Sequence, residues 1–240
     1  MPRHPRFLPP DNYYHIMNRG NNHMPIFTCV EDYQFYLQKI IELKAEHPFE
    51  LYHYCLMGTH IHLLVKINKN SDFSNFSKRL NLSYSSYFQR NYGSLGHFWQ
   101  GRFKSQLISN DAYFIQCGKY IELNPVSAGI TELPEKYPWS SYCYYAFGEQ
   151  NNLLTEDIFY QDLGVSLKER QQNYIDLIVE ISVAEEIDKS DTVAVGNKKF
   201  VYNSNRKAKY HETNKIVLIA KEVFNWGASP SPIQGLLEDF

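Results

Sequence analysis

The stretch from Tyr52 to Ile67 constrains the fold of this chain more than any other. Two runs rich in aromatic, β-branched and other apolar residues flank Gly58-Thr59, a pattern typical of two strands joined by a tight turn. Alternate residues of the second run share one face of the strand and are all apolar: Ile61, Leu63, Val65 and Ile67. This apolar row predicts a sheet face covered by helices.

The opposite face of the second run begins with two histidines. His60 and His62 are two residues apart, so their side chains leave the same side of the sheet. Imidazole pairs are common metal ligands, but two ligands do not complete a site. The chain contains nine histidines, so one such pair can also be purely structural. On these residues alone both interpretations stay open, and a third ligand with a reactive group is needed to decide.

The composition fits one large domain, with or without an appendage, because 43% of the 240 residues are apolar. The four cysteines are scattered without a Cys-x-x-Cys pair, which argues against a disulfide framework and a zinc knuckle. No apolar run reaches membrane-spanning length and the amino terminus lacks a signal-like core, so we expect a cytoplasmic protein without a membrane partner. Residues 1–150 are mildly basic and the remainder is acidic, which is compatible with a nucleic-acid-binding first part.

Apolar spacing predicts further elements around the hairpin. These are a strand over 13–19, helices over 31–46 and 72–91, an extended run over 105–108 and a helix over 112–123. We expect Pro125 to end the last of these helices. The chain changes character near residue 148, so we predict a domain over 1–148 and an extension over 149–240. The extension is expected to be mostly helical and partly flexible, and its role stays open.

The segment between residues 93 and 104 mixes glycine with aromatic and basic residues. Aromatic side chains interleaved with Arg and Lys are suited to stacking on bases and neutralising phosphates. A glycine-rich loop with Phe98 and Trp99 in the core would have the same composition. Composition alone favours neither interpretation.

Three blocks of the sequence, in this order and at this spacing, resemble the HUH single-tyrosine transposases. The blocks are His60-Ile-His62, Phe98–Ser105 and Tyr120–Val126, and Tyr14–Gly20 also resembles the family's opening strand. The resemblance is greatest to the REP-associated branch, bacterial proteins linked to repetitive extragenic palindromes, and spans about residues 10–146. It implies an α+β fold with a ferredoxin-like HUH core, in which helices pack on a mainly antiparallel sheet of four or five strands.

The resemblance also implies an active site. His60 and His62 would be two ligands of a divalent metal, and Asn124 falls where relatives place a polar third ligand. Family members use Mg²⁺ or Mn²⁺, of which Mn²⁺ suits imidazole better. Tyr120, one helical turn before Asn124, would be the nucleophile. Tyr113 is the local rival, but Cys117 stands where its paired amide should be.

The implied reaction is metal-dependent cleavage and strand transfer on single-stranded DNA hairpins of the REP type. Tyr120 would attack the scissile phosphate, leaving a 5′-phosphotyrosine link and a free 3′-hydroxyl. Relatives occur as monomers and as homodimers, and this sequence does not choose between them. The candidate DNA contacts are Arg3, Arg6, Arg90, Arg102 and Lys104 on phosphates, and Trp99 either on bases or in the core.

Two other functions compete with this one. The first is a domesticated, catalytically silent protein that binds DNA hairpins. The second is a metal-dependent hydrolase of a different substrate, in which Tyr120 is structural. The joint presence of His60, His62, Tyr120 and Asn124 favours the active enzyme, because a silent binder has no need of all four.

Overall fold

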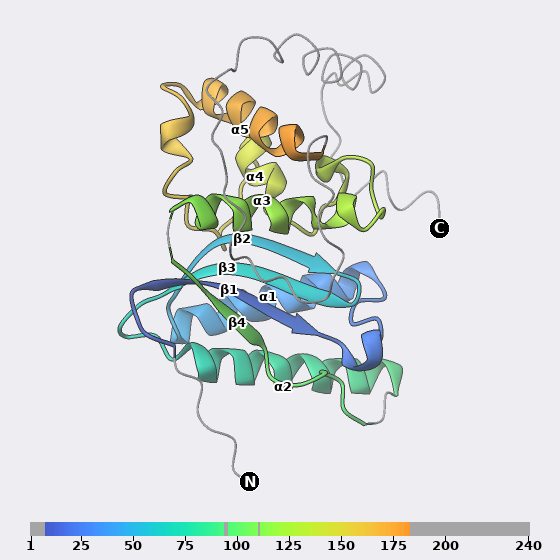
Figure 1. The fold of residues 1–240 in the computed structure, drawn as a ribbon. Coiled ribbons are helices and arrows are strands. Elements are labelled where there is room, and N and C mark those ends of the chain that lie inside the picture. The colour runs from blue at the N-terminus through green and yellow to red at the C-terminus, as the bar shows by residue number, and fades with distance from the viewer. Residues whose placement is uncertain (1–7, 94–95, 110, 183–240) are drawn as a thin grey trace.

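The computed structural model of the protein describes residues 8–93, 96–109 and 111–182 (Figure 1). Its centre is an antiparallel sheet of four strands in the order β2-β3-β1-β4. The strands are β1 (Asn12–Arg19), β2 (Glu50–Met57), β3 (His60–Ile67) and β4 (Lys104–Ile108). The predicted hairpin is therefore confirmed as β2 and β3, and the α+β fold with it.

Helices cover both faces of the sheet (Figure 1). Two long helices, α1 (Val30–Glu46) and α2 (Phe73–Tyr92), lie on one face, and α3 (Asp111–Ser127) crosses the other. A short helix, α4 (Tyr142–Phe147), and α5 (Leu167–Ser182) pack on α3 from the side away from the sheet. Short 3-10 helices form at Asn21–His23, Pro134–Lys136 and Gln161–Leu163. No helix of the described ranges is long and apolar enough to cross a membrane.

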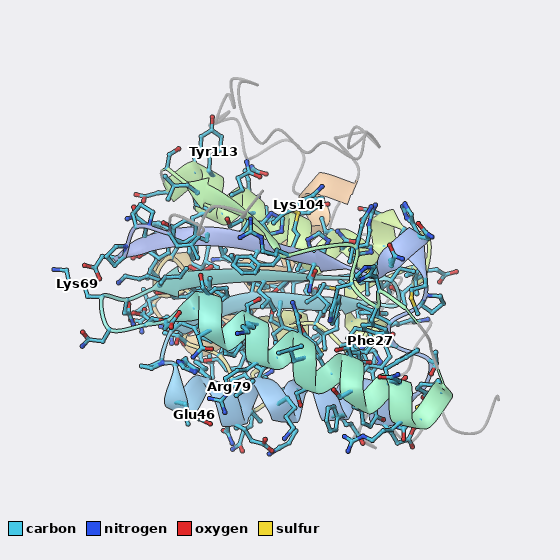
Figure 2. The ribbon with its side chains drawn as sticks, turned by 90° about the horizontal axis from the view of Figure 1, so that it is seen from below. Phe27, Glu46, Lys69, Arg79, Lys104 and Tyr113 are labelled. Carbon is cyan, nitrogen blue, oxygen red and sulfur yellow. The ribbon has the colours of Figure 1, made fainter. Side chains whose placement is uncertain are left out.

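The larger core lies between the sheet and the pair α1 and α2. It contains the predicted apolar row of β3, whose four side chains are at most 4% exposed. Figure 2 shows the two helices side by side, with Arg79 of α2 paired to Glu46 of α1. Asp32 is a second link, because its buried carboxylate accepts hydrogen bonds from Thr28 at the start of α1 and from Tyr87 and Tyr92 of α2.

The free edge of β2 is covered by the chain that follows α3. Backbone hydrogen bonds join Leu56 N to Trp139 O at 2.9 Å, Ser141 N to Tyr54 O at 3.0 Å and Thr155 N to Leu51 O at 2.7 Å. Leu153 is buried in the same core as the sheet. The segment on both sides of residue 148 therefore protects an edge that would otherwise present unpaired backbone groups. The predicted domain boundary at residue 148 stays a prediction.

The expectation that Pro125 ends its helix is wrong. Pro125 lies inside α3, which continues to Ser127. A proline in a helix removes one backbone hydrogen bond, but regular bonding resumes at once because Ala128 N donates to Asn124 O at 2.9 Å. Asn124 consequently sits within the helix, where its side chain is held, and not in a loop beyond it.

Candidate active site

The candidate site lies between α3 and the sheet at the beginning of β3. α3 packs across β2 and β3, and Tyr120 and Asn124 are one helical turn apart on the flank that faces the two histidines. β1 runs beside β3 in antiparallel register, with Arg19 opposite His60 and Met17 opposite His62. Residues directly opposite in such a pair share a face, so Arg19 lies on the same side of the sheet as the histidines.

The three predicted metal ligands converge. His60 Nε2 lies 3.3 Å from Asn124 Oδ1, and His62 Nε2 lies 3.5 Å from Asn124 Nδ2. The two imidazole rings are nearly perpendicular, with centroids 4.9 Å apart. Two ring nitrogens and one amide group therefore point at a common space. The described part of the chain has no group of three His, Cys, Asp or Glu side chains that could hold a metal ion, so a site here depends on the Asn124 amide.

Each histidine has its other ring nitrogen engaged. Nδ1 of His60 lies 3.0 Å from Thr59 Oγ1, and Nδ1 of His62 lies 2.9 Å from Nε2 of His15 on β1. Metal-ligating histidines characteristically use one nitrogen for the metal and the other for a hydrogen bond that orients the ring. The donor set and its supporting contacts thus fit a divalent cation.

Burial keeps the inner imidazoles neutral, which is the form that binds metal. Burial lowers the pKa of His15 to about 4. The pKa of His62 is held well below its usual range by burial first, and then by the neighbouring charges of His15, His60 and Arg19.

The ring of Tyr120 packs directly against this cluster. Its centroid is 5.5 Å from that of His62 and 5.9 Å from that of His15, with both rings edge-on to it. Burial raises the pKa of Tyr120, while its hydrogen bond with Asn124 and the charge of Arg19 act in the opposite direction. The phenol is therefore protonated at neutral pH. Tyr113, by contrast, lies at the beginning of α3 and projects outward in Figure 2.

Two residues of this site were missed at the level of sequence, namely His15 and Arg19. Both lie in the strand predicted over 13–19, where alternation places them on one face. The available signal was a histidine between Tyr14 and Ile16 in a predicted strand. The sequence does not predict the pairing of β1 with β3, which brings His15 to His62 and Arg19 to His60.

Those predicted DNA contacts that the structure describes fall on different surfaces. Trp99 and Arg102 line a groove of about 680 Å³ between α2 and residues 96–103, together with polar residues of α2 such as Lys78 and Asn81. Trp99 is half-buried and its Nε1 donates to Asn81 O at 3.1 Å, whereas Phe98 belongs to the core. Trp99 therefore combines a core role with a place at the groove wall.

Of the remaining basic candidates, Lys104 and Arg90 are described and do not line that groove. Lys104 is exposed at the start of β4, opposite Met17, which is itself opposite His62. It thus lies on the same face of the sheet as the histidines, two strands away, and Figure 2 shows it on the same side of the molecule as Tyr113. Arg90 is exposed on α2, with its Nε donating to Ser86 O. Arg3 and Arg6 lie outside the described residues.

Comparison with known proteins identifies the family. The family profile described as "Transposase IS200 like" matches residues 10–124. A Haemophilus influenzae protein assigned to the REP-associated tyrosine transposases is 30% identical over 129 residues, which cover 48% of this chain and 72% of that protein. The chain belongs to the REP-associated tyrosine transposases.

A second relative and one solved structure are also similar to this chain. The Escherichia coli K12 REP-associated tyrosine transposase is 26% identical over 130 residues, or 54% of this chain and 75% of that protein. A solved structure of a REP-associated tyrosine transposase bound to a REP hairpin has the same fold, with a TM-score of 0.52 and 22% identity over 66% of this chain and 93% of the other. The family profile ends at Asn124, so α4 and α5 lie beyond it.

Proposed function

We propose that this transposase is a metal-dependent endonuclease and strand transferase that acts on single-stranded DNA hairpins of the REP type through a covalent 5′-phosphotyrosine intermediate. One observation carries the proposal. The ring of Tyr120 packs against His62 while Asn124, on the same helix, meets His60 and His62. The proposed nucleophile and the proposed metal ligands therefore meet in one place within a single chain.

The chemistry follows from what these side chains can do. A protonated phenol is a weak nucleophile, so the scissile phosphate has to be held in line with Tyr120 and made more electrophilic. His60, His62 and Asn124 would hold a divalent cation, Mg²⁺ or Mn²⁺, which when bound neutralises charge on the phosphate oxygens. Arg19 adds a positive charge on the same face, opposite His60.

The proposed step balances without an external energy source. The bond from Tyr120 Oη to phosphorus forms, the bond from phosphorus to the 3′-oxygen breaks, and the phenolic proton ends on the 3′-hydroxyl. A phosphodiester replaces a phosphodiester of similar energy. The 3′-hydroxyl, or a second one, can therefore reverse the step, and the reversal by a second hydroxyl joins two strands.

Single-stranded DNA is the form of substrate that we propose for this site. Approach of Tyr120 to a backbone phosphate between α3 and the sheet requires a strand that is free to bend into the site. The relative of known structure binds a REP hairpin, which supports a hairpin as the partner of this chain. Arg90, Arg102 and Lys104 are the described candidates for phosphate contacts, and Trp99 at the groove wall is the candidate for base stacking.

The test is formation of a covalent protein–DNA adduct. End-labelled hairpin oligonucleotides from the host's own repeats are incubated with the protein in Mn²⁺ or in EDTA and separated on a denaturing protein gel. We expect a labelled band that requires Mn²⁺, is absent in Tyr120→Phe and persists in Tyr113→Phe. The Tyr113 variant is the matched control because it removes a hydroxyl from the same helix.

The other outcomes distinguish the competing functions. Binding of the hairpin without an adduct in any metal would replace the proposal with the silent binder. An adduct that survives in Tyr120→Phe would assign the nucleophile elsewhere. Absence of both adduct and binding, with a metal-dependent hydrolytic activity on another substrate, would favour the hydrolase.

A further inference from the structure

A second set of buried polar side chains lies beside α3, outside the site described above. His53 of β2 is held between two carboxylates, with Nδ1 2.8 Å from Glu122 Oε1 and Nε2 2.9 Å from Asp157 Oδ2. The three residues are 2%, 0% and 7% exposed. Charged groups this deeply buried are costly unless they are paired, so this arrangement is held only while all three partners are present.

Glu122 connects α3 to three other parts of the structure. Besides His53 on the sheet, it accepts hydrogen bonds from Ser141 Oγ at 2.6 Å, just before α4, and from Tyr174 Oη of α5. The carboxylate is thus bound from the sheet, from α4 and from α5. A single side chain with contacts on three sides leaves a helix little freedom to turn about its axis.

The position of Glu122 in the sequence gives that restraint a consequence for the candidate site. Tyr120 is two residues before it and Asn124 two residues after it. At about 100° per residue, both lie about 200° away around the helix, on the flank opposite Glu122. The contacts that hold Glu122 therefore set the direction in which Tyr120 and Asn124 point.

The spacing between α3 and β2 is set by the same histidine. A Cβ placed on Gly118 would lie 2.9 Å from His53 Nε2, which is closer than real side chains come. The ring cannot move aside without leaving its two carboxylates. Gly118 is one turn before Glu122, so close helix–sheet approach and the ion pair occur at the same place.

We propose that His53, Glu122 and Asp157 are positioning residues. They fix the rotation of α3 and thereby set the direction in which the side chains of Tyr120 and Asn124 point. The segment after residue 148 supplies Asp157 and the Tyr174 hydroxyl, so residues 149–182 work as part of the catalytic unit. This inference rests on the proposed function for its effect on catalysis. Its effect on the geometry of α3 does not depend on that function.

The test compares Glu122→Gln and Asp157→Asn with Asp32→Asn in the full-length protein. Asp32 is the matched control because it is also 0% exposed and holds a comparable set of hydrogen bonds, but it joins α1 to α2 on the other face of the sheet. Four quantities are measured: the free energy of unfolding, amide hydrogen exchange of each helix, Mn²⁺ affinity without DNA, and the adduct rate at saturating hairpin.

We expect the two network variants, at a temperature where they are folded, to exchange amides of α3 faster and to bind Mn²⁺ about 10- to 100-fold more weakly. Their adduct rate should fall by a similar factor, because a displaced reacting group slows the chemical step. Their dissociation constant for the hairpin in EDTA should stay within about twofold of that of the unmodified protein. Asp32→Asn should lose stability without these changes.

Two results would overturn the inference. One is that the network variants leave α3 exchange and Mn²⁺ affinity unchanged. The other is that all three variants lose adduct rate in proportion to their loss of stability, which is the behaviour of a purely structural network. If the unmodified protein forms no adduct, the proposed function fails. The amide-exchange and Mn²⁺-affinity measurements still decide whether the network fixes the rotation of α3.

Discussion

Nε2 of His15 on β1 lies 2.9 Å from Nδ1 of His62 on β3, so one histidine orients another across two paired strands. The hydrogen bond fixes the tautomer and ring angle of His62 and leaves its Nε2 directed at Asn124. Such supporting partners commonly set how well a ligand holds its metal. His15 is therefore a supporting part of the candidate site.

The first prediction concerns this support. His15→Phe keeps an aromatic ring stacked on His62 but removes the hydrogen bond, so we expect Mn²⁺ to bind about 10- to 100-fold more weakly. His15→Gln, which can restore a polar partner, should recover part of the affinity. Titration calorimetry with Mn²⁺ measures both. His47→Phe, on the far side of the sheet at the end of α1, is the control and should bind Mn²⁺ normally.

The second prediction tests whether Asn124 is a ligand. Asn124→Asp replaces a neutral amide with a carboxylate of the same shape, and charged oxygen ligands bind Mg²⁺ and Mn²⁺ more tightly than neutral ones. We expect the dissociation constant for Mn²⁺ to fall at least about threefold, and Asn124→Ala to raise it. If both substitutions leave metal affinity as it was, Asn124 only joins the two histidines by hydrogen bonds.

The local elements and the histidine motif could be predicted from sequence because their signals are local. Alternation in 60–67 identified β3, and the same alternation put His60 and His62 on one face. The contributions of His15, His53 and Asp157 could not be predicted, because each depends on which strands pair and how α3 lies on them. Pro125 misled for a related reason, since the packing of α3 outweighs one lost backbone bond.

The third prediction concerns the pH dependence of stability. Burial by itself would lower the pKa of His53, but its hydrogen bonds to Asp157 and Glu122 outweigh burial and raise the pKa to about 9. The unfolded value is about 6.5. The stabilisation is therefore complete below about pH 6.5 and is lost as the pH rises through about 9, and it amounts to something on the order of 3 kcal/mol.

Urea unfolding of the unmodified protein and of Asp157→Asn at pH 6.5 and at pH 9 isolates this contribution. The variant lacks one of the two carboxylates that raise the pKa of His53, so its free energy of unfolding should fall less between the two pH values. Tyr145, stacked on His53 with ring centroids 4.8 Å apart, is neutral throughout because burial raises its pKa. Equal losses in both proteins would show that His53 does not titrate in this range.

The fourth prediction separates DNA contacts from general surface charge. Lys104 is exposed on the sheet face that carries His62. Lys69 is also exposed, but it follows the last residue of β3, and His60 is the first residue of that strand (Figure 2). If Lys104 contacts a phosphate, binding of the Lys104→Ala variant releases about one counterion fewer. The slope of log affinity against log salt concentration should then become shallower by about 0.7 to 0.9. Lys69→Ala changes the net charge equally and should leave the slope unchanged.

Fluorescence anisotropy with a labelled hairpin in EDTA, over a series of salt concentrations, measures both slopes. Equal changes in the two variants would mean that the hairpin responds to net charge alone, and that the strand does not cross the sheet beside the histidines.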